Sequence, residues 1–151
     1  TLYYLTQDEA RRTHRLWRHR VGEAGPDTLL HEEPDALFWL DLDKTRDERY
    51  VVLSSASKDT SDLQVIDADD AAALPRFVLP RRTGLEMSLD HRAGRFYLLV
   101  NDTGRNFRLI ETAAEAPALA DARELVPQRD AVMLEQVDLF AGHHCPIQHG
   151  A

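Results

Sequence analysis

The stretch "RFYLLVNDTGRNFRLIETA", from Arg95 to Ala113, decides the fold. An apolar run leads into a polar turn that contains Gly104, and a second apolar run leads out of it. Short runs rich in β-branched and aromatic residues, separated by Asn, Asp and Gly, predict the two strands of a β-hairpin. The polar residues of the turn are either the tip of that hairpin or a reactive group. They are Asp102, Arg105 and Asn106.

The hairpin pattern occurs three times along the chain. "LYYLTQD" begins at Leu2, "YVVLSSA" at Tyr50 and "FYLLVND" at Phe96, so the starts lie 48 (50 − 2) and 46 (96 − 50) residues apart. A third and a fourth short run follow each hairpin. The fourth runs begin at Leu37, Leu85 and Leu134. A four-strand unit that recurs about every 40–50 residues is typical of the blades of a β-propeller.

We therefore predict an all-β fold: a partial β-propeller of about three four-stranded antiparallel blades, spanning residues 1–140 as an open arc. The polar turn is then the tip of a hairpin. We expect Gly104 to supply a positive φ and the Asn and Asp side chains to hydrogen-bond the turn backbone. The Ala-rich stretch 111–126, interrupted by Pro117, is a long connection with room for one helical turn. Residues 141–151 form an atypical tail, expected to be a truncation or a disordered end.

Composition narrows the classes of function. A formal charge of −8 argues against a general nucleic-acid binder, which needs a basic face. No apolar run approaches the roughly 18 residues of a membrane span. The single cysteine, Cys145, fits a reducing, cytoplasmic compartment. The chain has no signal-peptide pattern and no initiator Met, so we expect it to begin inside a longer reading frame or after processing.

The usual signatures of catalysis, cofactors and metals are missing from the sequence. None of the serines at positions 54, 55, 57, 61 and 88 lies in a G-x-S-x-G motif, and there is no Gly-rich phosphate loop, so we predict no catalytic residue and no cofactor. The carboxylates of Asp41–Glu48 and Asp67–Asp70 lack the spacing of a calcium loop and are interpreted as solvated turn charges.

The C-terminal tail contains four side chains that could bind a soft metal. Their spacing fits no standard zinc module, and neighbouring side chains of a strand point to opposite faces, so we predict no metal site. These residues are His143, His144, Cys145 and His149.

Five aromatic side chains are either a binding surface or packing between blades. Because they stand at predicted strand positions and aromatic rings dominate burial, we favour packing. They are Trp17, Phe38, Trp39, Tyr97 and Phe107.

With the repeats in register, residues 1–140 resemble the N-terminal propeller of oligopeptidase B, a branch of the prolyl oligopeptidase family of serine peptidases. The segments that carry the resemblance include "TLYYLTQDEARRTHRLWRHRVG", "RYVVLSSASKDTSDLQVIDADD" and "RFYLLVNDTGRNFRLIETA". It implies a seven-bladed propeller that covers an α/β-hydrolase domain, limits access to short peptides, and belongs to an enzyme that cleaves after Arg or Lys. The Ser-His-Asp triad belongs to the hydrolase domain, so no catalytic residue is assigned to this chain.

The sequence thus predicts a part of the substrate-gating propeller, inactive without its catalytic domain. Its expected partners are that missing α/β-hydrolase domain and short basic peptides, with neither nucleic acid nor membrane. The uncovered faces of the terminal blades predict self-association. Two alternatives stay open: a free-standing scaffold or interaction module, and an enzyme that uses carboxylates at the mouth of the propeller.

Overall fold

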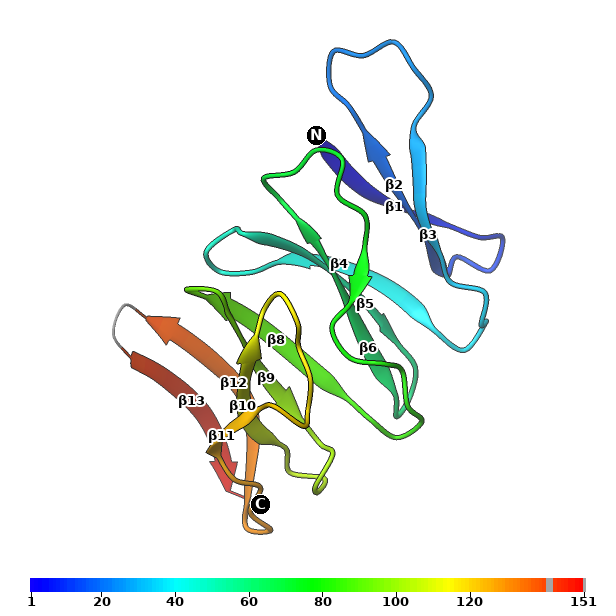
Figure 1. The fold of residues 1–151 in the computed structure, drawn as a ribbon. Coiled ribbons are helices and arrows are strands. Elements are labelled where there is room, and N and C mark those ends of the chain that lie inside the picture. Colours follow the sequence, from blue (N-terminus) through cyan, green and yellow to red (C-terminus); the bar gives the residue numbers. More distant parts are fainter. Residues whose placement is uncertain (141–142, 151) are drawn as a thin grey trace.

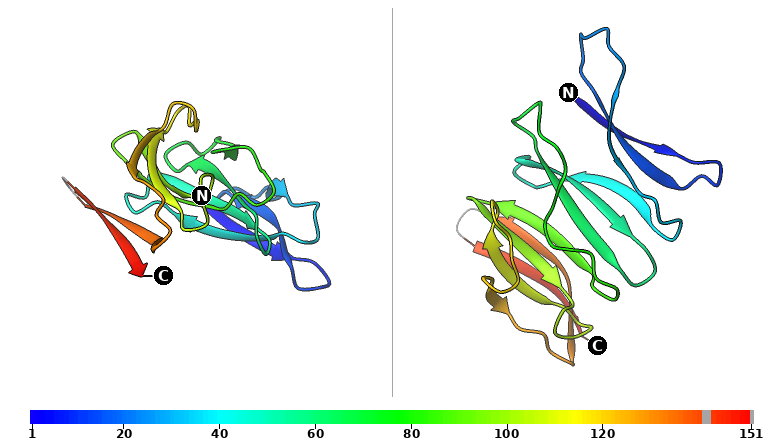
Figure 2. Two further views of the ribbon diagram at one scale, coloured as in Figure 1. Left: turned by 90° about the horizontal axis from the view of Figure 1, so that it is seen from below. Right: turned by 45° about the vertical axis from the view of Figure 1, so that its right-hand side comes forward.

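The computed structural model describes the backbone of residues 1–140 and 143–150 and the side chains of residues 1–139. The backbone of this part consists of strands, turns and loops, with no helix. Three antiparallel sheets and one further strand pair follow each other in chain order from the N-terminus to the C-terminal end (Figure 1). The right-hand view of Figure 2 shows the same succession of stacked sheets. The all-β partial propeller predicted from the sequence is confirmed.

Each sheet is an antiparallel ladder of strands that are consecutive in the chain. Sheet 1 contains β1 (Leu2–Gln7), β2 (Thr13–His19) and β3 (Thr28–Glu32). Sheet 2 contains β4 (Trp39–Lys44), β5 (Tyr50–Ala56), β6 (Ser61–Asp67) and β7 (Arg76–Phe77). Sheet 3 contains β8 (Met87–Arg92), β9 (Arg95–Val100), β10 (Arg108–Ala113) and β11 (Arg123–Val126). The last pair is β12 (Val132–Phe140) and β13 (His143–Gly150).

The grouping of strands into blades differs from the prediction by one strand. The sequence pattern places each fourth run with the three runs before it, whereas β4, β8 and β12 pair with the strands that follow them. Tight turns explain this pairing. Between β8 and β9 only Ala93 and Gly94 intervene, with φ values of 49° and 76°. A two-residue turn with positive φ at both positions matches the twist of a hairpin.

The connections that precede β4, β8 and β12 are the linkers between sheets. They comprise residues 33–38, 78–86 and 127–131, and each contains a proline: Pro34, Pro80 and Pro127. Because proline has no N–H to donate to a strand ladder, these positions separate one sheet from the next. The prolines are 46 (80 − 34) and 47 (127 − 80) residues apart, so they mark the true boundaries of the repeat.

Neighbouring residues of one strand pack against different sheets. In β5, Leu53 joins the buried cluster between sheets 1 and 2, whereas Val52 joins the cluster between sheets 2 and 3. In β9, Leu98 faces sheet 2, whereas Leu99 packs with Leu134 of β12. Successive side chains of a strand point to opposite faces, so a strand covered on both sides is continuously apolar. Each fully buried apolar side chain of this kind contributes about 1.5–3 kcal/mol to the stability of the fold.

The predicted packing role of the aromatic residues holds for most of them. Phe38 is buried, and Tyr97 and Phe107 pack against the cluster between sheet 3 and β12. Trp17 is half-buried and its indole donates a 3.0 Å hydrogen bond to Thr6 Oγ1. The prediction is wrong for Trp39, which is 53% exposed because it lies at the edge of sheet 2, at the start of β4.

The Ala-rich stretch forms the end of β10, a loop and β11, without a helical turn. Its loop is closed by the Ala118 N–H, which donates a 3.1 Å hydrogen bond to Thr112 Oγ1. Within the described residues, no helix is long and apolar enough to cross a membrane.

The segment that the sequence treats as an atypical tail is only partly described. Residues 143–150 form β13, which pairs antiparallel with β12 along its length. Residues 141, 142 and 151 lie outside the described residues, as do the side chains of the four possible metal ligands in the tail.

Candidate functional site

The polar turn between β9 and β10 is the tip of a hairpin. Asp102 accepts hydrogen bonds of 2.8 and 2.6 Å from the guanidinium of Arg108, and Arg105 is exposed. The buried Asn106 donates through its amide to the carbonyls of Arg129 and Asp130, at 2.8 and 2.9 Å. Asp102 thus ties the turn to β10 and Asn106 holds the linker that follows sheet 3.

Gly104 does not have the positive φ that the sequence predicts. The left-handed conformation in this turn belongs to Phe107, with φ of 63°. A Cβ on Gly104 would lie 2.6 Å from the side chain of Gln128. The absence of a side chain at Gly104 therefore leaves space for the Gln128 side chain, which comes from the linker after sheet 3.

Each hairpin tip holds the linker that leads to the next sheet. Arg12 donates to the carbonyls of Asp35 and Phe38 at 2.9 and 3.0 Å. Thr60 Oγ1 accepts a 2.9 Å hydrogen bond from the Gly84 N–H. With Asn106 these residues form a repeated linker clamp, spaced 48 (60 − 12) and 46 (106 − 60) residues apart. The repeat is thus visible in polar contacts as well as in the apolar runs.

A buried ion network beside the first clamp joins the first linker, sheet 2 and the second linker. It consists of Glu33 in the first linker, Ser55 in β5, Asp62 in β6 and Arg81 in the second linker. Arg81 donates to both carboxylates and, at 3.0 Å, to Ser55 Oγ, which in turn donates to Glu33 Oε2 at 2.7 Å. The carboxylates of Glu33 and Asp62 are 1% and 0% exposed.

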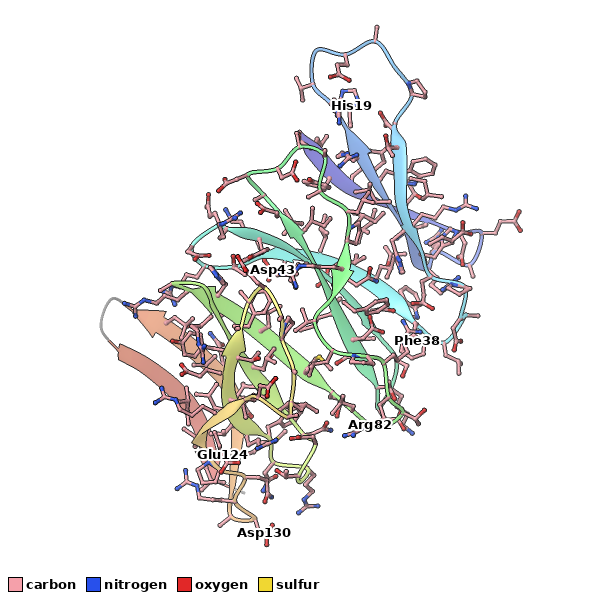
Figure 3. All side chains as sticks on the ribbon, viewed as in Figure 1. His19, Phe38, Asp43, Arg82, Glu124 and Asp130 are labelled. Atoms are coloured by element: carbon pink, nitrogen blue, oxygen red, sulfur yellow. The ribbon has the colours of Figure 1, made fainter. Side chains whose placement is uncertain are left out.

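Burial and hydrogen bonding act in opposite directions on the two carboxyl groups. For Asp62, burial dominates over the ion pair with Arg81 and raises the pKa. For Glu33, burial also raises the pKa, but hydrogen bonds from Arg81, Ser55 and a backbone N–H together outweigh it and leave the pKa below its ordinary value. The Arg81 guanidinium lies 3.9 Å from the centre of the Phe38 ring, which covers the network from one side. Figure 3 labels Phe38 and the neighbouring Arg82 at this end of sheet 2.

The serines of the described part are not arranged for nucleophilic catalysis. Ser55 is buried between a carboxylate and a guanidinium, and Ser61 donates to and accepts from the backbone of Met87. Within residues 1–139 no hydrogen bond joins a serine to a histidine, the contact that would activate a serine hydroxyl. Among these described side chains, no group of three or more metal-ligating residues gathers either.

The first-strand groove is a concave surface at the edge strands β4, β8 and β12, which are the first strands of sheet 2, sheet 3 and the last strand pair. It has a volume of about 370 Å³. Four carboxylates and two cationic groups line it, together with Ser88, Leu89, Gln136 and Val137. The charged members are Asp43, Lys44, Arg46, Asp90, Glu135 and Asp138. Figure 3 labels Asp43, which lies between the ends of sheets 2 and 3 in that view.

Arg46 connects the three strands of the first-strand groove. Its backbone N–H donates to Asp90 Oδ1 and its guanidinium donates to Asp138 Oδ1, both at 2.9 Å. Gln136 also donates to Asp138, at 3.1 Å. Even with both cations counted, the groove carries two more negative than positive groups (four carboxylates against Lys44 and Arg46). It therefore favours cationic ligands.

The carboxylates of the two acidic stretches of the sequence lie in different places and make different contacts. From Asp41–Glu48, Asp43 reaches the first-strand groove, whereas Asp47 pairs with His91 Nδ1 at 2.7 Å. Burial raises the pKa of Asp47, but hydrogen bonds from Thr45, His91 and a backbone N–H outweigh it. From Asp67–Asp70, Asp67 pairs with Arg49 and accepts from the Asp69 N–H at 2.9 Å, as a turn residue does.

A family model described as the prolyl oligopeptidase N-terminal β-propeller domain matches residues 1–145. The chain belongs to this family. Members with similar sequences carry peptidase names: Protease 2 of Moraxella lacunata is 34% identical over 110 residues, covering 72% of this chain and 16% of that protein. Dipeptidyl aminopeptidase BI of Pseudoxanthomonas mexicana is 28% identical over 145 residues, covering 94% of this chain and 20% of that protein.

Solved structures of oligopeptidases share the fold. Oligopeptidase B from Leishmania major superposes with a TM-score of 0.89 at 24% identity, covering 99% of this chain and 21% of that one. Oligopeptidase B from Trypanosoma brucei, with covalently bound antipain, gives 0.87 at 24% identity, covering 98% of this chain and 21% of that one. The chain thus spans 16–21% of the length of the relatives named here.

Proposed function

We propose that the chain is part of the substrate-gating propeller of an oligopeptidase B-like serine endopeptidase that cleaves short peptides after Arg or Lys. The observation that carries this proposal is the family match over residues 1–145, joined to the peptidase names of the relatives. The excess of carboxylates in the first-strand groove agrees with basic peptides as substrates.

The way the sheets are held together supports a gating role. Apolar clusters on both faces of a sheet and the clamped linkers make the stack of sheets stiff. A stiff ring of such sheets admits a flexible peptide but excludes a folded protein, because a folded protein cannot narrow without unfolding. The first-strand groove, with its net negative charge, raises the local concentration of cationic peptides.

Catalysis in this proposal comes from an α/β-hydrolase domain elsewhere in the longer protein, and the chain by itself is inactive. The contacts of Ser55 and Ser61 support this division of labour, because they are structural. The single cysteine supports a cytoplasmic location, where thiols stay reduced.

Hydrolysis of a fluorogenic peptide that ends in Arg-Arg tests this function. The longer protein encoded with this chain should release the fluorophore, and the 151-residue chain should not. A fluorophosphonate probe should label the longer protein and leave the chain unlabelled. Cleavage after Pro but not after Arg or Lys would overturn the proposed specificity, and labelling of any of the five serines of the chain would overturn its proposed inactivity.

A further inference from the structure

A second hollow lies beside the first-strand groove and is mainly apolar. It has a volume of about 430 Å³ and lies between sheets 2 and 3 and β12. Its apolar lining consists of Ala56, Met87, Leu99, Phe107, Met133 and Leu134. Most of these side chains are buried or half-buried, whereas Met133 is 37% exposed at the rim. We call this hollow the apolar pocket.

The apolar pocket and the first-strand groove adjoin each other. Ser88 of β8 and Glu135 of β12 line both of them. Both residues belong to first strands of successive sheets, so the combined surface runs across β8 and β12. Each hollow falls within the range of about 300–1,000 Å³ that is typical of small-ligand sites.

We propose that the two hollows together dock a short peptide in which an apolar side chain stands next to a cationic one. The apolar side chain enters the pocket over Met87 and Leu99, where it loses contact with water. The cationic side chain lies in the first-strand groove, where carboxylates outnumber cations. This charge complementarity selects a cationic peptide over an acidic one.

The proposal rests on the proposed function, since it assigns the docking of a basic peptide to the propeller itself. It goes beyond that function, because the site is made by residues of this chain and requires no contact with the catalytic domain. Glu86 and Glu135 also line the apolar pocket, so the negative potential extends over its rim.

The test is a titration of the isotope-labelled 151-residue chain, followed by amide NMR shifts, with the pentapeptide Gly-Leu-Arg-Leu-Gly. Amides of β8 and β12 should shift, and affinity should fall as salt is raised. The matched peptides Gly-Leu-Glu-Leu-Gly and Gly-Gly-Arg-Gly-Gly should each bind more weakly. Equal binding of the Arg and Glu peptides, or shifts confined to other strands, would overturn the proposal.

Two variants and one control locate the site. The double variant Asp43→Asn/Glu135→Gln should weaken binding of the Arg peptide about fivefold, because it removes two exposed charges from the groove. Met133→Ser should weaken binding of Gly-Leu-Arg-Leu-Gly while leaving Gly-Gly-Arg-Gly-Gly unchanged. Glu115→Gln, an exposed acid outside both hollows, is the control and should bind like the original chain. An equal loss in the control would overturn the proposal.

The outcome is separate from that of the proposed function. Absence of peptide binding, together with hydrolysis by the longer protein, would overturn the docking site and leave the peptidase function intact. Binding at β8 and β12 without hydrolysis by the longer protein would support the docking site and overturn the function.

Discussion

Removal of the central cation of the buried ion network tests the energetic reasoning most directly. In Arg81→Met, the new side chain can still cover Phe38, but Glu33 and Asp62 lose the guanidinium that neutralises them. Breaking a buried ion pair from one side costs about 3–5 kcal/mol. The carboxylates are buried, but the Arg81 side chain is 31% exposed, so water reaches part of the vacated space. We therefore expect a loss of about 3 kcal/mol in the free energy of unfolding.

The loss should depend on pH in a defined direction. Without Arg81, burial is the strongest remaining influence on both carboxyl groups, although Glu33 keeps the hydrogen bonds from Ser55 and a backbone N–H. We expect the pKa of each carboxyl to rise above its ordinary value of 3.8 for Asp and 4.5 for Glu. A group with a raised folded pKa stabilises the fold below its unfolded pKa, and this contribution is lost as pH rises through the folded pKa. The deficit of the variant should therefore be largest near neutral pH and should shrink as pH falls toward 4.5.

Urea unfolding of the chain at several pH values, followed by circular dichroism, measures this effect. Arg82→Met is the matched control, because Arg82 is the exposed neighbour, and it should change stability by less than about 0.5 kcal/mol. Adding Glu33→Gln and Asp62→Asn to Arg81→Met should restore most of the loss, since uncharged groups no longer need the cation. A deficit that stays constant between pH 7 and pH 4.5 would refute the electrostatic account.

Three further predictions concern the repeat. Asn106→Ala removes two hydrogen bonds from the third linker clamp and should lower the free energy of unfolding by about 1–3 kcal/mol, measured by urea unfolding; an unchanged midpoint would contradict a structural role for the clamp. Gly94→Ala should lower the free energy of unfolding by about 1 kcal/mol, because the φ of Gly94 is 76°. Gly104→Ala should lower it by less, because only the flexible Gln128 side chain must move. The reverse order in the same assay would be evidence against the turn assignments. The chain should self-associate through the outer face of sheet 1, where Tyr4 pairs with Trp17, and light scattering should show a mass that rises with concentration; a constant monomer mass at high micromolar concentration would rule this out.

The sequence predicts the strands and their period because both depend on local patterns. The runs around Leu53 and Leu98 are continuously apolar, and a strand that is buried on both faces must be so. The polar turns recur with the same spacing as the runs. These features need no knowledge of which sheet packs against which.

The strand at which each sheet begins, and the existence of the first-strand groove, could not be predicted from these local patterns. Which strand begins each sheet depends on which connections are tight turns and which are linkers. The spacing of the apolar runs does not contain this information. Two other features of the sequence do: the turn at Ala93 and Gly94, and the proline in each linker. The first-strand groove depends on stacking, because Asp43, Asp90 and Asp138 are far apart in the chain and meet only when sheets lie side by side. Exposure of Trp39 likewise depends on its place at a sheet edge.

The unequal apolar clusters have a consequence for how the chain comes apart. Thirteen buried residues form the cluster between sheets 2 and 3, but only four form the one between sheets 1 and 2. The latter contact is supplemented by guanidinium groups: Arg18 of β2 donates to the Ala73 carbonyl between β6 and β7, and Arg12 and Arg81 bind the linker that joins the two sheets. Guanidinium chloride supplies the same chemical group in solution and also screens charge, whereas urea does neither. The two denaturants should therefore unfold the chain in different orders. In guanidinium chloride, sheet 1 should unfold first, and the fluorescence of Trp17 should change at a lower denaturant concentration than the rest of the signal. In urea, the sheets should unfold together.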